Sequence, residues 1–260
     1  MADGSQKPGR RAINESLSKI TKTIGKAQMV LVIAGLGGSV GTAAITPLVE
    51  RLKKRKKAPL VVSVVVLPFV WEWTRSILAK KTVETLLVKS DSVIAVSNDK
   101  VHLSNPGAKM PQCLAMADGL LDLAVSSLTD LVYQPGEMNL DFADLRTALS
   151  AGDLGVMGFG EAKGPNRSIE AARTALNSPL METKSLTGAK YFLIQLNAPK
   201  DLKASEFIAL NEFLIKGLSP LAQVFLGLTY DENLRDSVKV IVIATGTLSD
   251  KKDPQVPKGP

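Results

Sequence analysis

"MVLVIAGLGGSVGTAAITPLVE", residues 29–50, joins an apolar run, a glycine-rich bend and a helix-like continuation. Nearly continuous Val, Ile and Leu runs are typical of strands buried on both faces, and three such runs lie at 28–34, 59–67 and 92–96. Helix-like stretches alternate with them, at 12–26, 43–55 and 74–89. This alternation predicts an α/β fold in which crossover helices connect a parallel sheet.

The glycine-rich bend, AGLGGSVGTA at 34–43, has the outline of a phosphate-binding loop. Between a strand and a helix, such a bend lets backbone N–H groups point at an anion, and the helix dipole adds to the attraction. It is not a Walker loop, because no Gly-Lys-Ser/Thr follows, and its spacing differs from that of the GxGxxG fingerprint. Taken alone, the bend fits tight packing of a strand on a helix about as well as it fits a bound nucleotide.

The second half of the chain begins with a long helical pattern at 109–133. Its apolar side chains fall on one broad face, at Leu114, Met116, Leu120, Leu121, Val125, Leu128 and Leu131. This pattern predicts a buried helix that connects two domains. The later elements predict a mixed α/β domain, with helices at 141–150, 167–178 and 203–218 and strands at 154–162, 190–197, 222–229 and 237–245. The polar segment between the last two strands predicts a hairpin-type return.

The composition bears on the compartment in which the protein works and on metal binding. The single cysteine, Cys113, rules out an intrachain disulfide and favours a reducing compartment. The polar N-terminus does not resemble a signal peptide, and the longest apolar run, at 58–71, is too short to span a bilayer. We therefore expect a soluble, cytoplasmic protein. One histidine, His102, and one cysteine form no cluster of ligands, so no metal site is predicted.

The formal net charge of +7 is concentrated toward the N-terminal end, above all in RLKKRKK, Arg51 to Lys57. Two interpretations of this run stay open. The cations can complement the dipole at a solvated helix C-terminus, or they can contact an anionic lipid, a nucleic acid or an acidic partner. No aromatic residues interleave with the basic ones, which favours the first interpretation.

Several segments, taken together, carry a family resemblance. LPFVWEWTR at 67–75, DSVIAVSNDK at 91–100 and PGEMNLDFADLRTALS at 135–150 follow the glycine-rich segment in the order found in the FtsZ/tubulin family. The similarity continues through 155–181 and 238–246 and covers roughly residues 8–247. By this resemblance the chain is identified as a divergent and N-terminally truncated member of that family of cell-division GTPases.

The resemblance implies the tubulin/FtsZ fold: a Rossmann-like GTPase sheet, a long central helix and a second α/β domain with a mixed sheet. On this basis 1–108 form a GTP-binding domain without its first strands, 109–133 the connecting helix, 134–247 the C-terminal domain and 248–260 a disordered tail. In that fold the missing first strand would lie beside 28–34. We therefore expect this strand to be an apolar sheet edge that can pair with another chain.

The resemblance also implies a site shared between two subunits of a filament. GTP or GDP, with Mg²⁺, is bound by one subunit, and a loop of the next subunit acts on it. The binding positions correspond to Gly35, Gly37, Gly38, Gly41, Thr42, Glu72, Arg75 and Asn98, and the catalytic loop to Asn139, Asp141 and Asp144. Simpler interpretations stay open: a surface ion pair for Glu72 and Arg75, and a strand-ending turn for Asn98. For Asp141 the simpler interpretation is the start of a helix.

The sequence departs from the family pattern at identifiable positions. Ser39, Val40 and Ala43 replace Gly, Thr and Gly, and Gly119 stands where the long helix usually offers an aspartate to guanine. We therefore expect nucleotide affinity below that of a full-length relative, and a GTPase that is weak or depends on a partner chain. The expected function is an FtsZ-like, GTP-dependent filament subunit. The alternatives are a non-hydrolysing cap on filaments of a full-length relative, and an inactive fragment.

Overall fold

The computed structural model describes residues 7–133, 136–138, 140–151, 154–178, 181 and 188–246. Within them a seven-stranded sheet has the spatial order β1 (Met29–Gly35), β2 (Leu60–Leu67), β3 (Ser92–Ser97), β4 (Leu154–Lys163), β7 (Ser237–Thr245), β5 (Tyr191–Ala198) and β6 (Gln223–Tyr230). The predicted tail at 248–260 lies outside the described residues.

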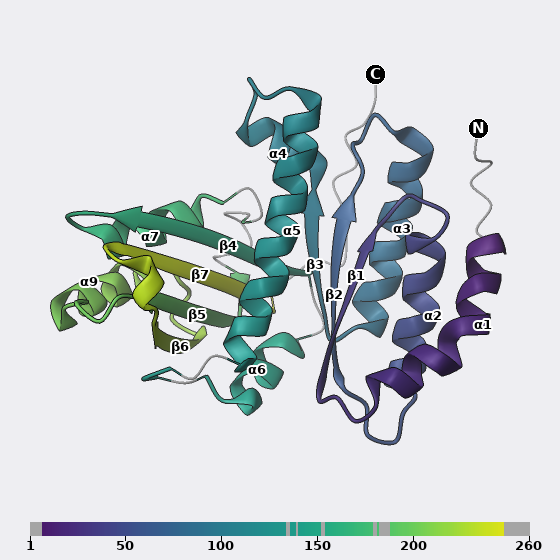
Figure 1. Cartoon of the computed structure of the whole chain (residues 1–260), viewed down its shortest axis with the longest axis horizontal. Helices are drawn as coiled ribbons and strands as arrows, with labels where there is room; N and C mark the ends of the chain where they lie inside the picture. The colour runs from purple at the N-terminus through teal and green to yellow at the C-terminus, as the bar shows by residue number, and fades with distance from the viewer. Residues whose placement is uncertain are drawn as a thin grey trace.

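The described helices are α1 (Lys7–Ile24), α2 (Gly41–Lys53), α3 (Trp73–Lys89), α4 (Asn98–Ser104), α5 (Met110–Tyr133), α6 (Phe142–Leu149), α7 (Arg167–Leu176) and α9 (Ala204–Ile215). Figure 1 shows α2 and α3 on one side of the β1–β3 part of the sheet, with α1 outside α2. On the other side α5 runs from α4 at the top of the view to α6 at the bottom and lies between the two halves.

The sheet combines a parallel half and a mixed half. β1, β2 and β3 are parallel, and β3 joins β4 through two residue pairs, Val93 with Leu154 and Ile94 with Gly155. β7 is antiparallel to both β4 and β5, and β5 is parallel to β6. The predicted fold class, a parallel Rossmann-like sheet with a long helix and a second mixed α/β part, is confirmed.

The apolar runs form strands because each is covered from both sides. In β2, Val61 and Val65 face the core made with α2 and α3, whereas Val62 and Val64 face the core made with α5 and α6. Period-2 alternation sends neighbouring residues to opposite faces, so a strand between two helical layers needs apolar residues at nearly every position. The α5 core also contains Ile243 of β7 and thus joins the two halves.

The predicted hairpin between the last two strands is wrong. β5 lies between β6 and β7, pairing with β6 in parallel and with β7 in antiparallel orientation. β7 is buried at all but one position, so the free energy gained by burying it favours a central place between β4 and β5. The polar connection, which contains a short 3-10 helix at Glu232–Leu234, therefore passes β5 instead of turning tightly.

Two predictions around α4 also need correction. The simpler interpretation of Asn98 as a strand-ending turn is wrong, because Asn98–Ser104 is helical and the Ser97 hydroxyl accepts a hydrogen bond from the N–H of Lys100. Ser and Asn favour helix N-caps as well as loops, so composition alone could not separate the two. On α5, Leu114 and Met116 were expected to be buried but are exposed, because its first turns lie against α4.

Candidate nucleotide-binding site

Three of the predicted binding segments meet at one edge of the sheet. Parallel strands end on the same side, so the residues that follow β1, β2 and β3 are neighbours at the top of Figure 1. Leu36 N–H donates to the Val66 carbonyl at 2.9 Å, and Val70 N–H donates to Asp99 Oδ2 at 2.9 Å. Ligands of open α/β sheets bind at this carboxyl edge.

The glycine-rich bend is partly tightened by the fold and partly open. Gly37 has φ +88° and donates its N–H to Thr42 Oγ1 at 2.8 Å, and a Cβ on Gly41 would lie 2.3 Å from the Gly35 carbonyl oxygen. These contacts explain why glycine occupies positions 37 and 41, because a side chain there would collide with neighbouring atoms. In contrast, a Cβ on Gly35 or Gly38 would meet no atom within 4 Å. The space beside these two glycines is therefore open to a ligand.

The N-terminus of α2 lies directly after the bend. Its N-cap residue, Val40, makes no side-chain capping bond, and its side chain is 69% exposed. N–H groups in the first turn of a helix have no intrahelical partner, and the helix dipole makes that end attractive to anions. Thr42, predicted to be a phosphate contact, is 3% exposed, and its hydroxyl accepts the bond from Gly37.

Glu72 and Arg75 form an ion pair next to the bend. Arg75 Nη1 donates to Glu72 Oε2, while Glu72 Oε1 accepts a bond from Phe69 N–H at 3.2 Å. A Cβ on Gly37 would lie 2.9 Å from the Arg75 Cβ, so the pair and the glycine-rich bend are adjacent. The simpler interpretation as an ion pair is thus correct for this structure, and a role in binding stays a prediction.

Asn98 lies at the first position of α4 and is 8% exposed. Its Oδ1 accepts no hydrogen bond from any residue that the structure describes. Buried polar atoms in proteins are nearly always paired, so an unpaired one at a sheet edge suggests a ligand. Asp99 was not among the predicted binding residues, yet its Oδ2 accepts from Val70 N–H and so fixes the β2–α3 loop. The Asn-Asp pair directly after β3 is the sequence signal that points to it.

Two of the predicted catalytic residues, Asp141 and Asp144, lie at the other end of α5, at the start of α6 (Figure 1). Asp141 is the N-cap of α6: its Oδ1 accepts from Ala143 N–H at 3.4 Å, and Asp144 Oδ2 accepts from Asp141 N–H at 3.3 Å. The preceding loop is held to β6 by a two-way bridge between Met138 and Leu228. Asn139 lies outside the described residues. The two groups of predicted residues are therefore not brought together within one chain.

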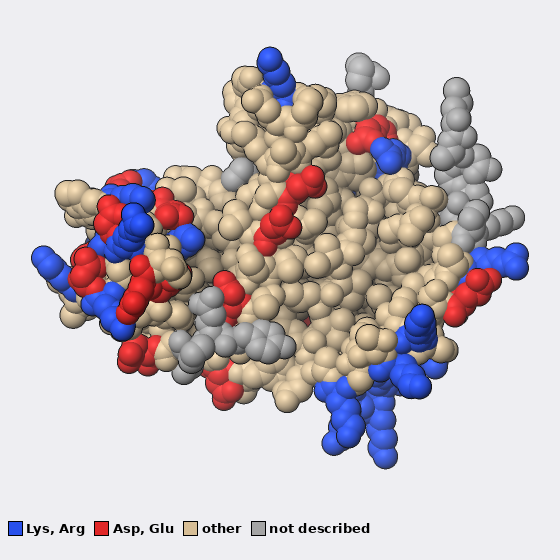
Figure 2. All heavy atoms as spheres, viewed as in Figure 1, with Lys and Arg blue, Asp and Glu red and all other residues tan. Residues whose placement is uncertain are grey.

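A basic cluster lies at the opposite end of β1 and β2 from the glycine-rich bend (Figure 2). Part of the Arg51–Lys57 run is used internally: Lys53 pairs with Asp91 at 2.8 Å, and Arg55 donates to the carbonyls of Thr21 and Gly25. The remaining cations are exposed, at Arg51, Lys54, Lys56 and Lys57. Close by, a hydrogen bond from Lys89 lowers the pKa of Glu50.

Among the residues that the structure describes, no group of three or more His, Cys, Asp or Glu side chains is arranged to hold a metal ion. In the same part of the chain no helix is both long and apolar enough to cross a membrane. Cys113 is buried, and its Sγ lies 3.8 Å from the Ala108 carbonyl oxygen.

We expect Gly37→Ala to lower the free energy of unfolding by about 2 kcal/mol, because it places a side chain at positive φ against Arg75 and Pro68. Gly38→Ala is the matched control in the same bend, and it should change stability by less than about 0.5 kcal/mol, since its Cβ meets open space. Urea titrations followed by circular dichroism measure both values. Equal effects of the two variants would show that the contacts at Gly37 do not shape the bend.

Comparisons with known proteins agree with this arrangement. The family model described as Tubulin/FtsZ family, GTPase domain matches residues 1–105, and the one described as FtsZ family, C-terminal domain matches 153–248. Cell division protein FtsZ 1 of Thermococcus kodakarensis is 36% identical over 249 residues, which cover 95% of this chain and 66% of that protein. Cell division protein FtsZ of Pseudomonas aeruginosa is 33% identical, covering 94% of this chain and 62% of that protein. The chain thus spans slightly less than two thirds of their length.

Solved structures give the same result. A structure described as an empty FtsZ dimer of M. jannaschii superposes with a TM-score of 0.86 at 32% identity and covers 98% of this chain and 78% of that chain. CetZ2 from Haloferax volcanii, at 16% identity and a TM-score of 0.74 over 95% of this chain and 75% of that chain, shares the fold. Both halves of the molecule, in the same order along the chain, match these proteins. The chain belongs to the tubulin/FtsZ family.

Proposed function

We propose that this chain is an FtsZ-like cytoskeletal cell-division subunit that binds GTP at the carboxyl edge of β1–β3. The observation that carries the proposal is the buried, unpaired Oδ1 of Asn98 beside an open glycine-rich bend. A guanine ring carries N–H donors that could satisfy this acceptor. The triphosphate suits the other end of the edge, where backbone N–H groups and the α2 dipole attract anions.

Different residues of this edge would bind different parts of the nucleotide. The open backbone at Gly35 and Gly38, with the first turn of α2, would hold phosphate oxygens. Arg75 would neutralise phosphate charge, and Glu72 would accept from a ribose hydroxyl. Mg²⁺ is bound in many nucleotide sites mainly by phosphates and water, so it needs no cluster of protein carboxylates.

Hydrolysis would need a second subunit. Asp141 and Asp144 lie at the α6 end of the molecule, remote from the nucleotide edge, and therefore can act only on a nucleotide held by a neighbouring molecule. Their carboxylates would orient the attacking water, which is a positioning role suited to phosphoryl transfer. The neighbour would be a second copy of this chain or a full-length FtsZ, so turnover would follow assembly.

A second candidate function, a non-hydrolysing modulator of another FtsZ's filaments, is favoured by specific contacts at the edge. The Thr42 hydroxyl is occupied by Gly37 N–H, and the Arg75 guanidinium by Glu72. Both groups would have to give up these bonds to meet phosphate. Such a molecule would use its α6 end on a neighbour's GTP while binding nucleotide poorly itself.

The test uses the only two tryptophans, Trp71 and Trp73, which flank Glu72 and are 68% and 69% exposed. We expect GTP to change their fluorescence saturably and ATP at the same concentration to have little effect. Turnover should rise with protein concentration. No fluorescence change with GTP, combined with an altered rate of GTP hydrolysis by added full-length FtsZ, would favour the modulator. No binding and no effect on the mixture would overturn both candidates.

A further inference from the structure

The basic cluster, whose blue side chains gather at the lower edge of the molecule in Figure 2, has no part in the proposed function. Besides the four exposed cations of the Arg51–Lys57 run, it includes two exposed lysines at the end of α1 and in the turn that follows. None of these side chains forms an ion pair with a carboxylate of the described residues. The exposed cations of the cluster are Lys22, Lys26, Arg51, Lys54, Lys56 and Lys57.

The fold holds this cluster in place through the two other cations of the run. Arg55 donates to the carbonyls of Thr21 and Gly25 and so ties the turn after α2 to the end of α1. Lys53 pairs with Asp91 at 2.8 Å, just before β3. The segments that carry the exposed cations are therefore fixed before any partner binds, which lowers the entropy cost of binding.

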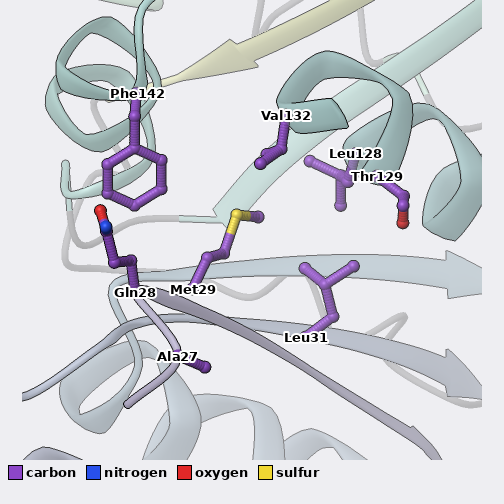
Figure 3. A pocket seen from close by; sticks show the side chains of 8 residues that line it. All are labelled: Ala27, Gln28, Met29, Leu31, Leu128, Thr129, Val132 and Phe142. Carbon is purple, nitrogen blue, oxygen red and sulfur yellow. The ribbon is translucent and has the colours of Figure 1, made fainter. Parts of the chain in front are cut away.

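The surroundings leave the positive charge of the cluster in place. Two carboxylates of this region are already neutralised, because Glu50 pairs with Lys89 and Asp91 pairs with Lys53. Toward α5 the surface becomes uncharged: the side chains that Figure 3 labels, beginning with Ala27, carry no charge. α2 lies between α1 and α3, so the cluster lies at the end of the middle helix of its layer (Figure 1).

We propose that the basic cluster docks this chain on a lipid bilayer that contains anionic phospholipid. Each lysine near such a surface strengthens binding about fivefold, since its charge is attracted to the negative leaflet. Lysine acts as a point charge on a flexible stem and needs no fixed geometry of the phosphate. All exposed cations of the cluster except Arg51 are lysines. A bilayer presents many phosphate groups in one plane, so several lysines can reach it together.

Nucleic acids and acidic proteins fit these residues less well. Single-stranded nucleic acid is bound by aromatic side chains as well as cations, and the run of basic residues contains none. Paired recognition of a phosphate in duplex nucleic acid favours the planar fork of arginine, which Arg51 alone offers among the described exposed cations of the cluster. Protein interfaces depend on apolar or aromatic centres, in which lysine is depleted.

The test is sedimentation of the whole chain with lipid vesicles, without nucleotide, so that its result does not depend on the proposed GTP site. The chain should sediment with vesicles of phosphatidylcholine that contain about one third phosphatidylglycerol, and stay in solution with phosphatidylcholine alone. Lys54→Gln, Lys56→Gln and Lys57→Gln together should weaken binding about 100-fold, because three charges leave the cluster. Salt at about 0.5 M should release the unchanged chain, since it screens the attraction.

Lys81→Gln, Lys109→Gln and Lys216→Gln together are the matched control, because they remove the same charge from exposed positions elsewhere. This variant should bind the anionic vesicles within about threefold of the unchanged chain, since distant surface charges are screened. Equal losses in the two variants would show that only net charge matters and would overturn the proposal. No binding to anionic vesicles, or release from them by duplex DNA at an equal phosphate concentration, would also overturn it. Thermal melts would confirm that both variants are folded.

Discussion

Asp141→Asn combined with Asp144→Asn should lower GTP turnover at least about 100-fold, while the chain stays folded and binds nucleotide as before. The reason is the place of these residues at the α6 end, remote from the nucleotide edge of their own molecule, so that under the proposed function they would act on a neighbour's nucleotide. Asparagine is as good an N-cap as aspartate, so the first turn of α6 should survive. The variants therefore separate the charge of Asp141 from its capping bond to Ala143.

The measurement is the initial rate of phosphate release, by the chain alone and mixed with a full-length FtsZ. Glu137→Gln is the matched control, because it removes an exposed carboxylate from the loop before α6. It should leave turnover unchanged. If the Asp141/Asp144 variant releases phosphate as fast as this control, the α6 end has no part in hydrolysis. If the unchanged chain shows no effect in either assay, the proposed function itself fails.

Arg167→Met should lower the free energy of unfolding by roughly 2–3 kcal/mol, since it leaves the partly buried Glu206 carboxylate and the Asp236 carbonyl without their donor. Arg167 is 7% exposed and joins three parts of the second half. Its guanidinium contacts Glu206 Oε2 at 3.1 Å, Asp201 Oδ1 at 2.8 Å and the Asp236 carbonyl oxygen at 3.0 Å. The bond to Asp201 raises the pKa of Arg167, burial lowers it, and Glu206 raises it again.

Arg173→Met on the same helix is the control. Arg173 is 56% exposed and pairs with Glu170 at 3.5 Å, and such surface pairs contribute less than about 1 kcal/mol. Urea unfolding gives both values. Arg167→Lys adds a further comparison, because it keeps the charge but loses the planar fork, and it should recover part of the loss. Equal stability of the Arg167→Met and Arg173→Met variants would show that this network does not hold the second half together.

That the candidate binding segments meet at one edge of the sheet could be predicted from the sequence. Strands followed by Gly35, Glu72 and Asn98 all end at one edge because parallel strands must, and the resemblance supplied their roles. Which of these polar groups already have a hydrogen-bond partner within the chain could not be predicted. That Thr42 is occupied by Gly37 and that Asn98 Oδ1 is unpaired depends on loop conformations, which spacing does not specify. The roles themselves stay predictions until nucleotide binding is measured.

Short-range patterns in the sequence determined the strands, most helices and the parallel half of the sheet, because periodicity and burial on both faces leave few other solutions. Only the tertiary structure decided that β5 lies between β6 and β7, since the gain comes from contacts between segments remote in sequence. It also decided that Arg167 is buried and joins separate elements, because its hydrogen-bond partners are remote from it in the sequence. Finally, the length of α5 set the two groups of predicted site residues at opposite ends of the molecule.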